Sequence, residues 1–545
     1  MPGLYLLRVR PYVLLSAVLA CFSLFSQTDV EIIGGNKLFV DQVKGLQYIV
    51  GNVGIRHNGV IIQCDSAIRK MNEGKIEGFG HIYIYQPDTF TLSGGEYLQY
   101  EEASKTAVVT GKEVILKDQS MTLVTTSLQY NIASQVGSYL NGANILSENN
   151  TLKSKKGFYD RRTNVFHFKE NVKLTSPEYT MEGDTLDYYS STRTAYFFGK
   201  TVITSKENTI NCSYGWYNTA KEIASFSRGA EISSKNNLLK ADSLYYDRKQ
   251  GYGKATRNIE LIDTLESFTI FGQSGYYNQK TKESYVSVNP VAVQSKDEDT
   301  LYIQADTFYF LNDSLNKIMR AYHKVQIFQK DMKGRCDSMD YIFNDSMIRL
   351  FRSPILWSEK NQISGDTMFI QLKNKRIHTL RVQDNAFLAS EVKPDYYNQI
   401  AGKQMINFFD SSKLKSVLVQ GNAQSIYYLR DNETDSAQYT GVNKVACGKM
   451  LIELDSSKVK VIKFYTQPEG NMYPLKQFPD SEKYLKGFKW QPNEIPVVET
   501  FKLRMKKQTV VLVNTVKKDI SKPVKKKDKP KKSSSTKRLK KENLQ

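Results

Sequence analysis

Aspartates recur at a fixed place along this chain, and their carboxylates are the side chains best suited to chemistry. Six of them follow a small residue and usually precede Ser or Thr: Asp65, Asp184, Asp242, Asp306, Asp337 and Asp366. Paired carboxylates cleave glycosidic bonds, but such a pair occurs once in an enzyme, whereas this pattern repeats. Aspartate beside Ser or Thr also caps turns through hydrogen bonds to the backbone. We therefore expect turn-capping aspartates at strand starts, no catalytic residues, and a protein that is not an enzyme.

The histidines give no metal or nucleophile pattern either. The five are scattered without the spacing of metal ligands: His57, His81, His167, His323 and His378. The sequence has no GxSxG nucleophile motif, and its glycine pairs lack the context of a nucleotide-binding loop. We predict no metal site and no cofactor.

The elements that carry these residues are repeats of roughly 30 residues. The stretch from Gly183 to Ile203, GDTLDYYSSTRTAYFFGKTVI, has near-copies on both sides. Its tyrosine belongs to an anchor column spaced by 29 to 33 residues: Tyr100, Tyr130, Tyr159, Tyr188, Tyr217, Tyr246, Tyr277, Phe310, Tyr341 and Ile370. Such a period indicates an array in which each repeat stacks on its neighbours.

Each repeat predicts two β-strands joined by a polar turn. Its two apolar runs alternate in polarity, and turn residues such as SSTRT after Tyr189 separate them. Glycines 11 or 12 residues after an anchor, including Gly111, Gly142, Gly199 and Gly229, indicate a bend inside the second strand. The sequence therefore predicts a long, regularly bent all-β structure.

Four cysteines occupy the column of small residues five positions before the anchors, and we expect them to be free thiols. They are Cys64, Cys212, Cys336 and Cys447. Because they lie several repeats apart, strands at ~4.8 Å spacing hold them beyond the ~7 Å Cα separation of a disulfide.

A second apolar column lies two positions before the anchors and shares one strand face with them. Together the two columns supply the residues that we expect to line an apolar groove: Leu98, Leu128, Leu186, Tyr188, Leu244, Tyr246, Met339, Tyr341 and Met368. The alternative is that these side chains fill a closed core and leave no groove.

The start of the chain predicts export. Arg8 and Arg10 precede an apolar run that is too short for a membrane span, and Ser26 is a small residue suited to cleavage. An alternative is a lipoprotein cut before Cys21. The predicted segments are a signal peptide (1–26), a first repeat region (27–293), a looser repeat region (294–466), a Pro-punctuated cap with a short helix at Pro479 to Lys486 (467–510) and a disordered Lys-rich tail (511–545).

The positive charge is concentrated at the end of the chain. The net charge is +20, and residues 517–545 hold 13 Lys and Arg against 3 acidic residues, a net charge of +10. That composition cannot bury enough apolar surface to fold. The tail is expected either to be simply solvated or to contact an anionic surface; nucleic acid is not an expected partner of an exported chain.

The repeat pattern resembles the OstA-like (organic solvent tolerance) family of lipopolysaccharide-transport proteins. The resemblance rests on Gly183 to Tyr188 (GDTLDY), on Gly199 to Ile203 (GKTVI) and on Ala241 to Tyr246 (ADSLYY). It implies an elongated β-jellyroll, a V-shaped stack of antiparallel strands. The implied function is to shelter acyl chains of lipopolysaccharide, or a similar lipid, in the periplasm during outer-membrane assembly. The implied partners are other lipopolysaccharide-transport proteins, joined by strand addition at the ends of the stack, and an outer-membrane association is compatible with this role.

Two other classes stay open. Coils of twenty to thirty residues also occur in parallel β-helix enzymes that act on polysaccharides, and a structural scaffold would use the same repeats with a filled core. Strand direction separates the first class from the transport fold, since neighbouring strands are parallel in a β-helix.

Overall fold

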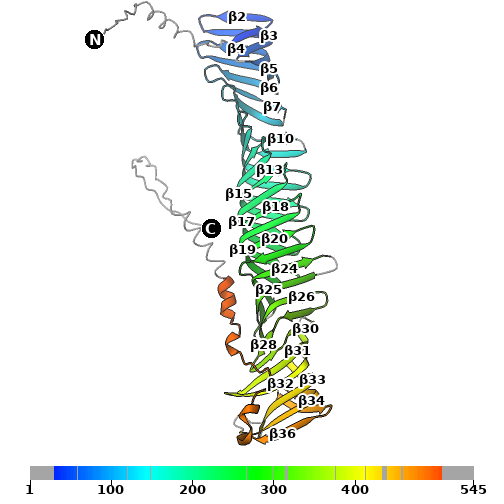
Figure 1. Cartoon of the computed structure of the whole chain (residues 1–545). Coiled ribbons are helices and arrows are strands. Elements are labelled where there is room, and N and C mark those ends of the chain that lie inside the picture. The colour runs from blue at the N-terminus through cyan, green and yellow to red at the C-terminus, as the bar shows by residue number, and fades with distance from the viewer. Residues whose placement is uncertain are drawn as a thin grey trace, which may run out of the picture.

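The computed structural model of the protein describes residues 30–505, except 58, 120, 148, 266, 297–298, 314–316, 375, 411–412, 432–437 and 456–457. The predicted signal peptide and Lys-rich tail lie outside the described residues. The described part is nearly all β and forms one long stack of strands, as the sequence predicted (Figure 1). Among the described helices, none is both long enough and apolar enough to cross a membrane.

The strands follow one another along the stack in chain order. The first eighteen are β1 (Glu31–Gly34), β2 (Lys37–Asp41), β3 (Leu46–His57), β4 (Val60–Lys70), β5 (Lys75–Gln86), β6 (Phe90–Glu101), β7 (Thr106–Asp118), β8 (Thr122–Asn131), β9 (Val136–Tyr139), β10 (Ala143–Ser147), β11 (Asn150–Ser154), β12 (Lys156–Asp160), β13 (Val165–Thr175), β14 (Tyr179–Tyr189), β15 (Thr194–Ser205), β16 (Thr209–Asn218), β17 (Ile223–Ser233) and β18 (Asn237–Asp247). The second eighteen are β19 (Tyr252–Asp263), β20 (Phe268–Asn278), β21 (Glu283–Ser287), β22 (Val291–Lys296), β23 (Asp299–Gln304), β24 (Thr307–Asn312), β25 (Lys317–Phe328), β26 (Lys333–Ile342), β27 (Met347–Phe351), β28 (Ile355–Ser358), β29 (Asn361–Ser364), β30 (Thr367–Lys373), β31 (Arg376–Lys393), β32 (Tyr396–Asp410), β33 (Lys413–Arg430), β34 (Tyr439–Asp455), β35 (Lys458–Tyr465) and β36 (Glu469–Pro474).

Neighbouring strands are antiparallel, so the β-helix alternative is wrong. Strand β14 pairs antiparallel with β13 before it and with β15 after it, and the same order continues to β33 and β34. Where one strand is broken, its two pieces pair with the same neighbour, as β9 and β10 both do with β8. Each turn returns the chain directly beside itself, which a parallel coil cannot do.

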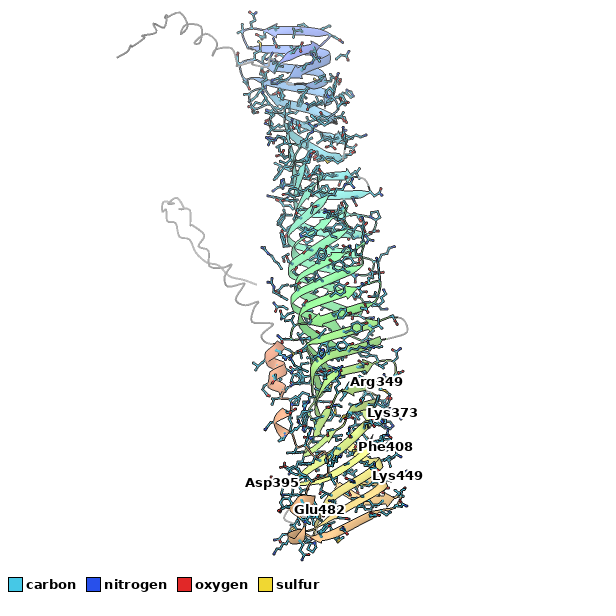
Figure 2. The ribbon with its side chains drawn as sticks, in the orientation of Figure 1. Arg349, Lys373, Asp395, Phe408, Lys449 and Glu482 are labelled. Carbon is cyan, nitrogen blue, oxygen red and sulfur yellow. The ribbon has the colours of Figure 1, made fainter. Side chains whose placement is uncertain are left out.

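Each long strand bends near its middle. The bends of neighbouring strands are aligned, and together they divide the sheet into two halves that run along the stack. In the pairing of β14 with β15 the register shifts between Gly183 and Thr185, and every long neighbour shifts at the equivalent place. We call the half with residues 179–183 leg A and the half with residues 185–189 leg B. The turns of leg A and leg B form two rows on opposite sides, marked in Figure 2 by Asp395 and Lys373 respectively.

Backbone geometry explains the bend. Residues at the bend adopt positive φ, such as 82° at Gly199 and 79° at Gly229, where glycine is favoured. Asn258 (φ 50°) and Asn385 (φ 51°) occupy the same place in later strands, and Asn tolerates this conformation better than most residues. The predicted glycine column is therefore the bend, with asparagine replacing glycine in part of the array.

The column of small residues lines the inside of the bend. A Cβ atom added to Gly95 would lie 2.4 Å from Val109 Cγ1, and one added to Gly272 would lie 2.3 Å from Val286 Cγ1. The same crowding recurs later in the array, which explains why the column contains Gly, Ala, Ser, Thr and Cys. The four predicted thiols are free and buried in this column.

The aspartates that follow the small column do not cap turns at strand starts, so that expectation was wrong. They lie at the bend, and five of the six pair with side chains of a neighbouring strand: Asp65, Asp242, Asp306, Asp337 and Asp366. The Asp65 carboxylate accepts from His81 at 2.7 Å, and Asp366 accepts from the Asn385 amide at 2.9 Å. The backbone at the bend projects an aspartate and a positive-φ residue to the outside together, which sequence spacing alone did not show.

The inner faces of the two legs pack together into an apolar core. One continuous cluster of buried side chains runs from Ile49 to Ile259, and a second runs from Phe268 to Ile452. The Leu and Met column lies inside this core, as the two-residue periodicity predicted.

Residues 475–505, which we call the strap, fold back along the outer face of leg A. The strap contains the 3-10 turns η1 (Leu475–Gln477), η2 (Asp480–Glu482) and η3 (Pro492–Glu494) and a helix at residues 498–505. Its Leu485 packs on Phe387 and Tyr428. Its Phe501 contacts the ring of Tyr302 in β23, ten strands before the strand of Tyr428. Figure 1 shows the strap returning beside the stack. Within Pro479 to Lys486, the expected short helix, the structure has only η2.

Candidate functional site

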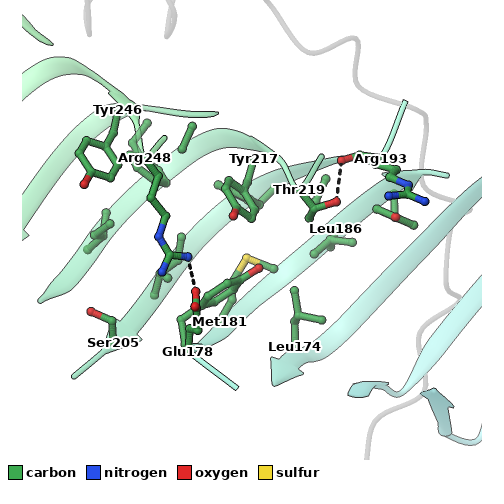
Figure 3. Close-up of a pocket in the computed structure, with 18 of the residues that line it drawn as sticks. Leu174, Glu178, Met181, Leu186, Arg193, Ser205, Tyr217, Thr219, Tyr246 and Arg248 are labelled. Carbon is green, nitrogen blue, oxygen red and sulfur yellow. Dashed lines mark hydrogen bonds and ion pairs between the residues drawn. The ribbon is translucent and has the colours of Figure 1, made fainter. Parts of the chain in front are cut away.

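A cavity of about 1720 Å³ lies between the two legs in the middle of the stack. We call the space between the inner faces of the legs the trough, and the opening between their two rows of turns the mouth. The cavity is lined by residues between Asp88 and Val286, and Figure 3 shows part of it. It is larger than the ~300–1,000 Å³ typical of sites for small ligands.

The floor of the cavity is apolar because the strands alternate inward and outward side chains. Leu186 of β14 pairs directly with Phe197 of β15, and Phe226 of β17 pairs with Leu244 of β18. All four side chains are buried and all four line the cavity. The ring of Phe197 lies 6.3 Å from that of Phe226, so the aromatic floor continues from one strand pair to the next.

The nine predicted groove residues fall into two groups. Leu186, Tyr188, Leu244 and Tyr246 line the cavity, with the two leucines on the floor and the two tyrosines closer to the mouth. The other five are not part of the cavity lining and lie in, or pack against, the two apolar clusters: Leu98, Leu128, Met339, Tyr341 and Met368. Whether any of the nine contacts a lipid stays a prediction.

Aromatic contacts close the trough before the cavity begins. Phe90, at the leg A end of β6, lies with its ring 4.8 Å from that of Tyr130, at the leg B end of β8. His57, at the leg A end of β3, likewise contacts Tyr100, at the leg B end of β6. The histidine ring and the tyrosine hydroxyl form a hydrogen bond. Burial raises the pKa of Tyr130, as expected for a phenol closed off from water.

Two contacts also cross the mouth above the cavity. Tyr179 of leg A meets Tyr217 of leg B edge to face at 5.9 Å. Beside them, the Arg248 guanidinium donates to the Glu178 carboxylate, as Figure 3 shows. Burial raises the pKa of Tyr217, and the neighbouring Arg248 opposes that rise. Glu178 precedes β14 and Arg248 follows β18, so the ion pair joins turns of opposite legs.

The two rims of the mouth carry opposite charge. The carboxylates in the cavity lining come from leg A, in its turns or at a strand end, namely Asp88, Asp118, Glu178 and Glu207. Four of the five basic side chains in the lining come from leg B, namely Arg161, Arg193, Arg248 and Lys254, and only Lys206 lies on leg A. An anion inside the mouth therefore meets a basic rim on one side only.

The histidines that form ion pairs and the buried cysteines of the described residues occupy structural positions. Among them, no group of three or more His, Cys, Asp or Glu side chains could hold a metal ion. His81, His167 and His323 each pair with a single aspartate of a neighbouring strand. Burial raises the pKa of Cys64 to about 11 and that of Cys336 to about 12, so these thiols stay protonated and unreactive at neutral pH.

The two ends of the stack present strand edges. At the start, β1 and β2 pair only with β3 among the described strands, and Leu38, Phe39 and Val40 of β2 are exposed. At the other end, β35 and β36 pair only with β34 among the described strands. Unpaired edges with exposed apolar side chains are templates for an added strand.

The sequence interpretation expected Lys and Arg near the rim of the groove but could not identify the individual charged residues of the mouth. It treated the turns only as the connections between strands, whereas Glu178 and Arg248 come from turns and face each other. A signal was present, because Asp88, Asp118 and Glu178 recur at intervals of 30 or 60 residues in the turns of one leg. Recognising it required knowing that alternate turns lie on opposite rims.

Comparison with known proteins finds a family to which the first part of the chain is similar. Residues 28–184 match the OstA-like protein family, which confirms the predicted resemblance over that segment. No curated protein matches the sequence. Among solved structures, the chain is similar to LptH from Pseudomonas aeruginosa, the LptA homologous periplasmic component of a lipopolysaccharide transport device, with 11% identity, a TM-score of 0.15, and coverage of 27% of this chain and 94% of that chain.

Proposed function

We propose that this protein, whose residues 28–184 match the OstA-like family, carries lipopolysaccharide or a similar acyl lipid across the periplasm with the acyl chains in the trough. The family match supports a transport protein and not an enzyme. The trough would keep the chains out of water while the lipid moves toward the outer membrane during its assembly.

The observation that carries this proposal is the cavity of about 1720 Å³ with its apolar floor. A fully packed core is expected for a scaffold protein, whereas here the legs separate in the middle of the stack. The volume exceeds what one small ligand needs, and its elongated lining from Asp88 to Val286 suits several alkyl chains lying side by side.

The chemistry of the lining favours hydrocarbon over water. A water molecule in a cavity needs two to four polar partners, and Leu186, Phe197, Phe226 and Leu244 provide none. Each methylene group transferred from water to such a surface contributes about 0.8 kcal/mol. A lipid with several long chains therefore gains enough free energy to occupy the trough.

Partners of this function would add strands to the ends of the stack. Strand addition needs an exposed strand edge, and the exposed strands β2 and β36 provide one at each end. Other components of the transport pathway are the proposed partners, since a shared sheet would make their troughs continuous. The proposed location is the periplasm, with outer-membrane association through such a partner.

The test is site-specific photo-crosslinking in cells. A photo-reactive amino acid at Leu186, on the cavity floor, is expected to capture lipopolysaccharide. The matched control is Asp187, the next residue of β14, whose side chain pairs with His167 on the outer face. Equal lipid capture at the two positions would contradict the proposal.

A further inference from the structure

The Glu178–Arg248 ion pair crosses the mouth at the centre of the cavity. Glu178 lies in the turn between β13 and β14 on leg A, and Arg248 lies in the turn between β18 and β19 on leg B. Both side chains line the cavity, and in Figure 3 the arginine extends over the trough toward the glutamate. Any molecule that enters the trough from the side at this point must separate them.

A second pair of the same polarity crosses further along. Asp263, at the leg A end of β19, lies 3.5 Å from Lys317, at the leg B start of β25. In both pairs the acid belongs to leg A and the base to a later strand of leg B. An acid of leg A and a base of leg B therefore bridge the two rims at more than one place.

The Glu178–Arg248 pair is weak enough to open. The two side chains are 55% and 46% exposed, respectively. Ion pairs at such exposure contribute only about 0–1 kcal/mol, because water and salt screen them. A ligand group with the same affinity for Arg248 as the Glu178 carboxylate can therefore replace that carboxylate with little loss of free energy.

The basic rim suits an anionic head group. Guanidinium groups bind phosphate through paired hydrogen bonds, as they bind carboxylates. With Glu178 displaced, Arg248 lies on the same rim as Arg193 and Arg161, beside a floor that accepts alkyl chains. The acidic turns of leg A repel an anion on the opposite side, so the head group is directed to leg B.

We propose that the Glu178–Arg248 pair is a closure that the ligand itself opens: the phosphate head of an acyl lipid replaces the Glu178 carboxylate on Arg248 and stays on the basic rim. This inference rests on the proposed function, since it assumes that alkyl chains occupy the trough. It adds the chemical class of the head group, the residue that binds it and the direction of entry, from the side through the mouth.

The test uses the exported chain, residues 27–545, with the uncharged fluorescent dye N-phenyl-1-naphthylamine in the trough. Three competitors share one alkyl chain and differ in head charge: dodecyl phosphate, dodecyl maltoside and dodecyltrimethylammonium, each below its micellar concentration. Dodecyl phosphate is expected to displace the dye about fivefold better than the maltoside at low salt, and the difference should vanish near 1 M salt. Inorganic phosphate alone should displace no dye.

Two variants separate the closure from the binding of the head group. Both Glu178→Gln and Arg248→Gln break the ion pair and should speed dye entry. Only Arg248→Gln should remove the preference for dodecyl phosphate, while Glu178→Gln keeps or increases it. The matched control is Lys249→Gln, which removes a positive charge from the same turn without touching the cavity lining and should leave both properties unchanged.

The outcomes distinguish the inference from the proposed function. Equal displacement of the dye from the unaltered protein by dodecyl phosphate and dodecyl maltoside would overturn the inference, and so would an Arg248→Gln variant that still prefers dodecyl phosphate. Neither result would contradict the binding of alkyl chains in the trough. If no alkyl competitor displaced the dye, both would fail. Displacement by inorganic phosphate alone would mean an anion site unrelated to lipid and would also overturn the inference.

Discussion

The Asn258 side-chain amide donates to both carboxylate oxygens of Asp242 across the bend, at 3.0 and 3.1 Å. Asn258 has a φ of 50°, and Asp242 directly follows the small residue Ala241 on the neighbouring strand. One strand therefore supplies the positive-φ residue that makes the bend, and its neighbour supplies the acid that fixes it. The repeated aspartates hold the shape of the trough.

Val288→Asn should stabilise the protein. Val288 has a φ of 64° at the bend, where a β-branched side chain is strained, and it is exposed, so no packing compensates. Asparagine should relieve about 1 kcal/mol of strain. The measurement is the denaturant midpoint of unfolding. Val40→Asn, at another exposed valine of a strand without positive φ, is the control and should give no gain.

Leu98→Asp should destabilise the protein more than Leu186→Asp. Both leucines are buried, but Leu98 lies where the legs pack together and Leu186 lies on the cavity floor. Water can reach a carboxylate at Leu186 when no lipid is present, which avoids part of the cost of several kcal/mol for a dry charge. Unfolding midpoints of the two variants check this. Equal losses would mean that the cavity is closed to water.

The four described cysteines should not react with a thiol reagent at pH 8 in the folded protein. Burial raises the pKa of Cys212 to about 11, so the reactive thiolate is scarce and also shielded. In denaturant without reductant, four thiols per chain should react in the protein that begins at residue 27. A count below four would reveal a disulfide and contradict the arrangement of the repeats.

Alkaline pH should weaken the protein through its buried tyrosines. Tyr139 bonds to Ser154 at 2.6 Å, and burial raises its pKa from about 10 to about 12. The folded state therefore holds this proton more tightly than the unfolded state does. Its contribution to stability is complete below pH ~10 and is lost as the pH rises through 12.

Tyr139→Phe checks this assignment. The variant should lose less stability than the unaltered protein between pH 10 and 12, and the delayed phenolate absorbance at 295 nm should shrink by one group. If the two proteins showed the same alkaline loss, Tyr139 would not be a contributor.

Gln399→Leu should loosen the strap. Gln399 is fully buried, donates to the Lys483 carbonyl and accepts from the Leu485 N–H, both at 2.9 Å. Leucine would leave these strap groups buried without partners, at a cost of about 1–3 kcal/mol. Faster proteolysis within residues 475–505 is the expected readout. Gln404→Leu, which loses only a bond to Gln383 on leg B, is the control.

The regular part of this fold could be predicted from the sequence because residues that are close in the sequence specify it. The alternation around Leu186 and Tyr188 and the polar turn after Tyr189 specify two antiparallel strands without knowledge of the rest of the chain. Repetition then made the stack, the bend and the inward column predictable. The outer position of the aspartates was not, because it depends on how two bent strands align at the register shift.

The contacts across the mouth could not be predicted. Glu178 and Arg248 lie 70 residues apart, and Phe90 and Tyr130 lie on strands two steps apart, so the partner across the trough depends on the offset between the legs. That offset leaves no periodic trace in the sequence. The path of the strap along leg A was unpredictable for another reason: Phe488 and Trp490 lie in a proline-rich segment whose apolar residues follow no period.

The returning strap gives the chain an uneven folding order. Most strands pair with the strand that follows them, so the loops closed during folding are short and the array can nucleate at many points. The Gln362 side chain instead bonds to the carbonyl of Lys489, 127 residues later, and to the N–H of Gln491. Closing so long a loop costs more entropy, and it needs both leg A and the end of the chain in place. We therefore expect the strap to assemble last, and a chain that stops before that step should expose the apolar outer face around Phe387 and Tyr428 to aggregation.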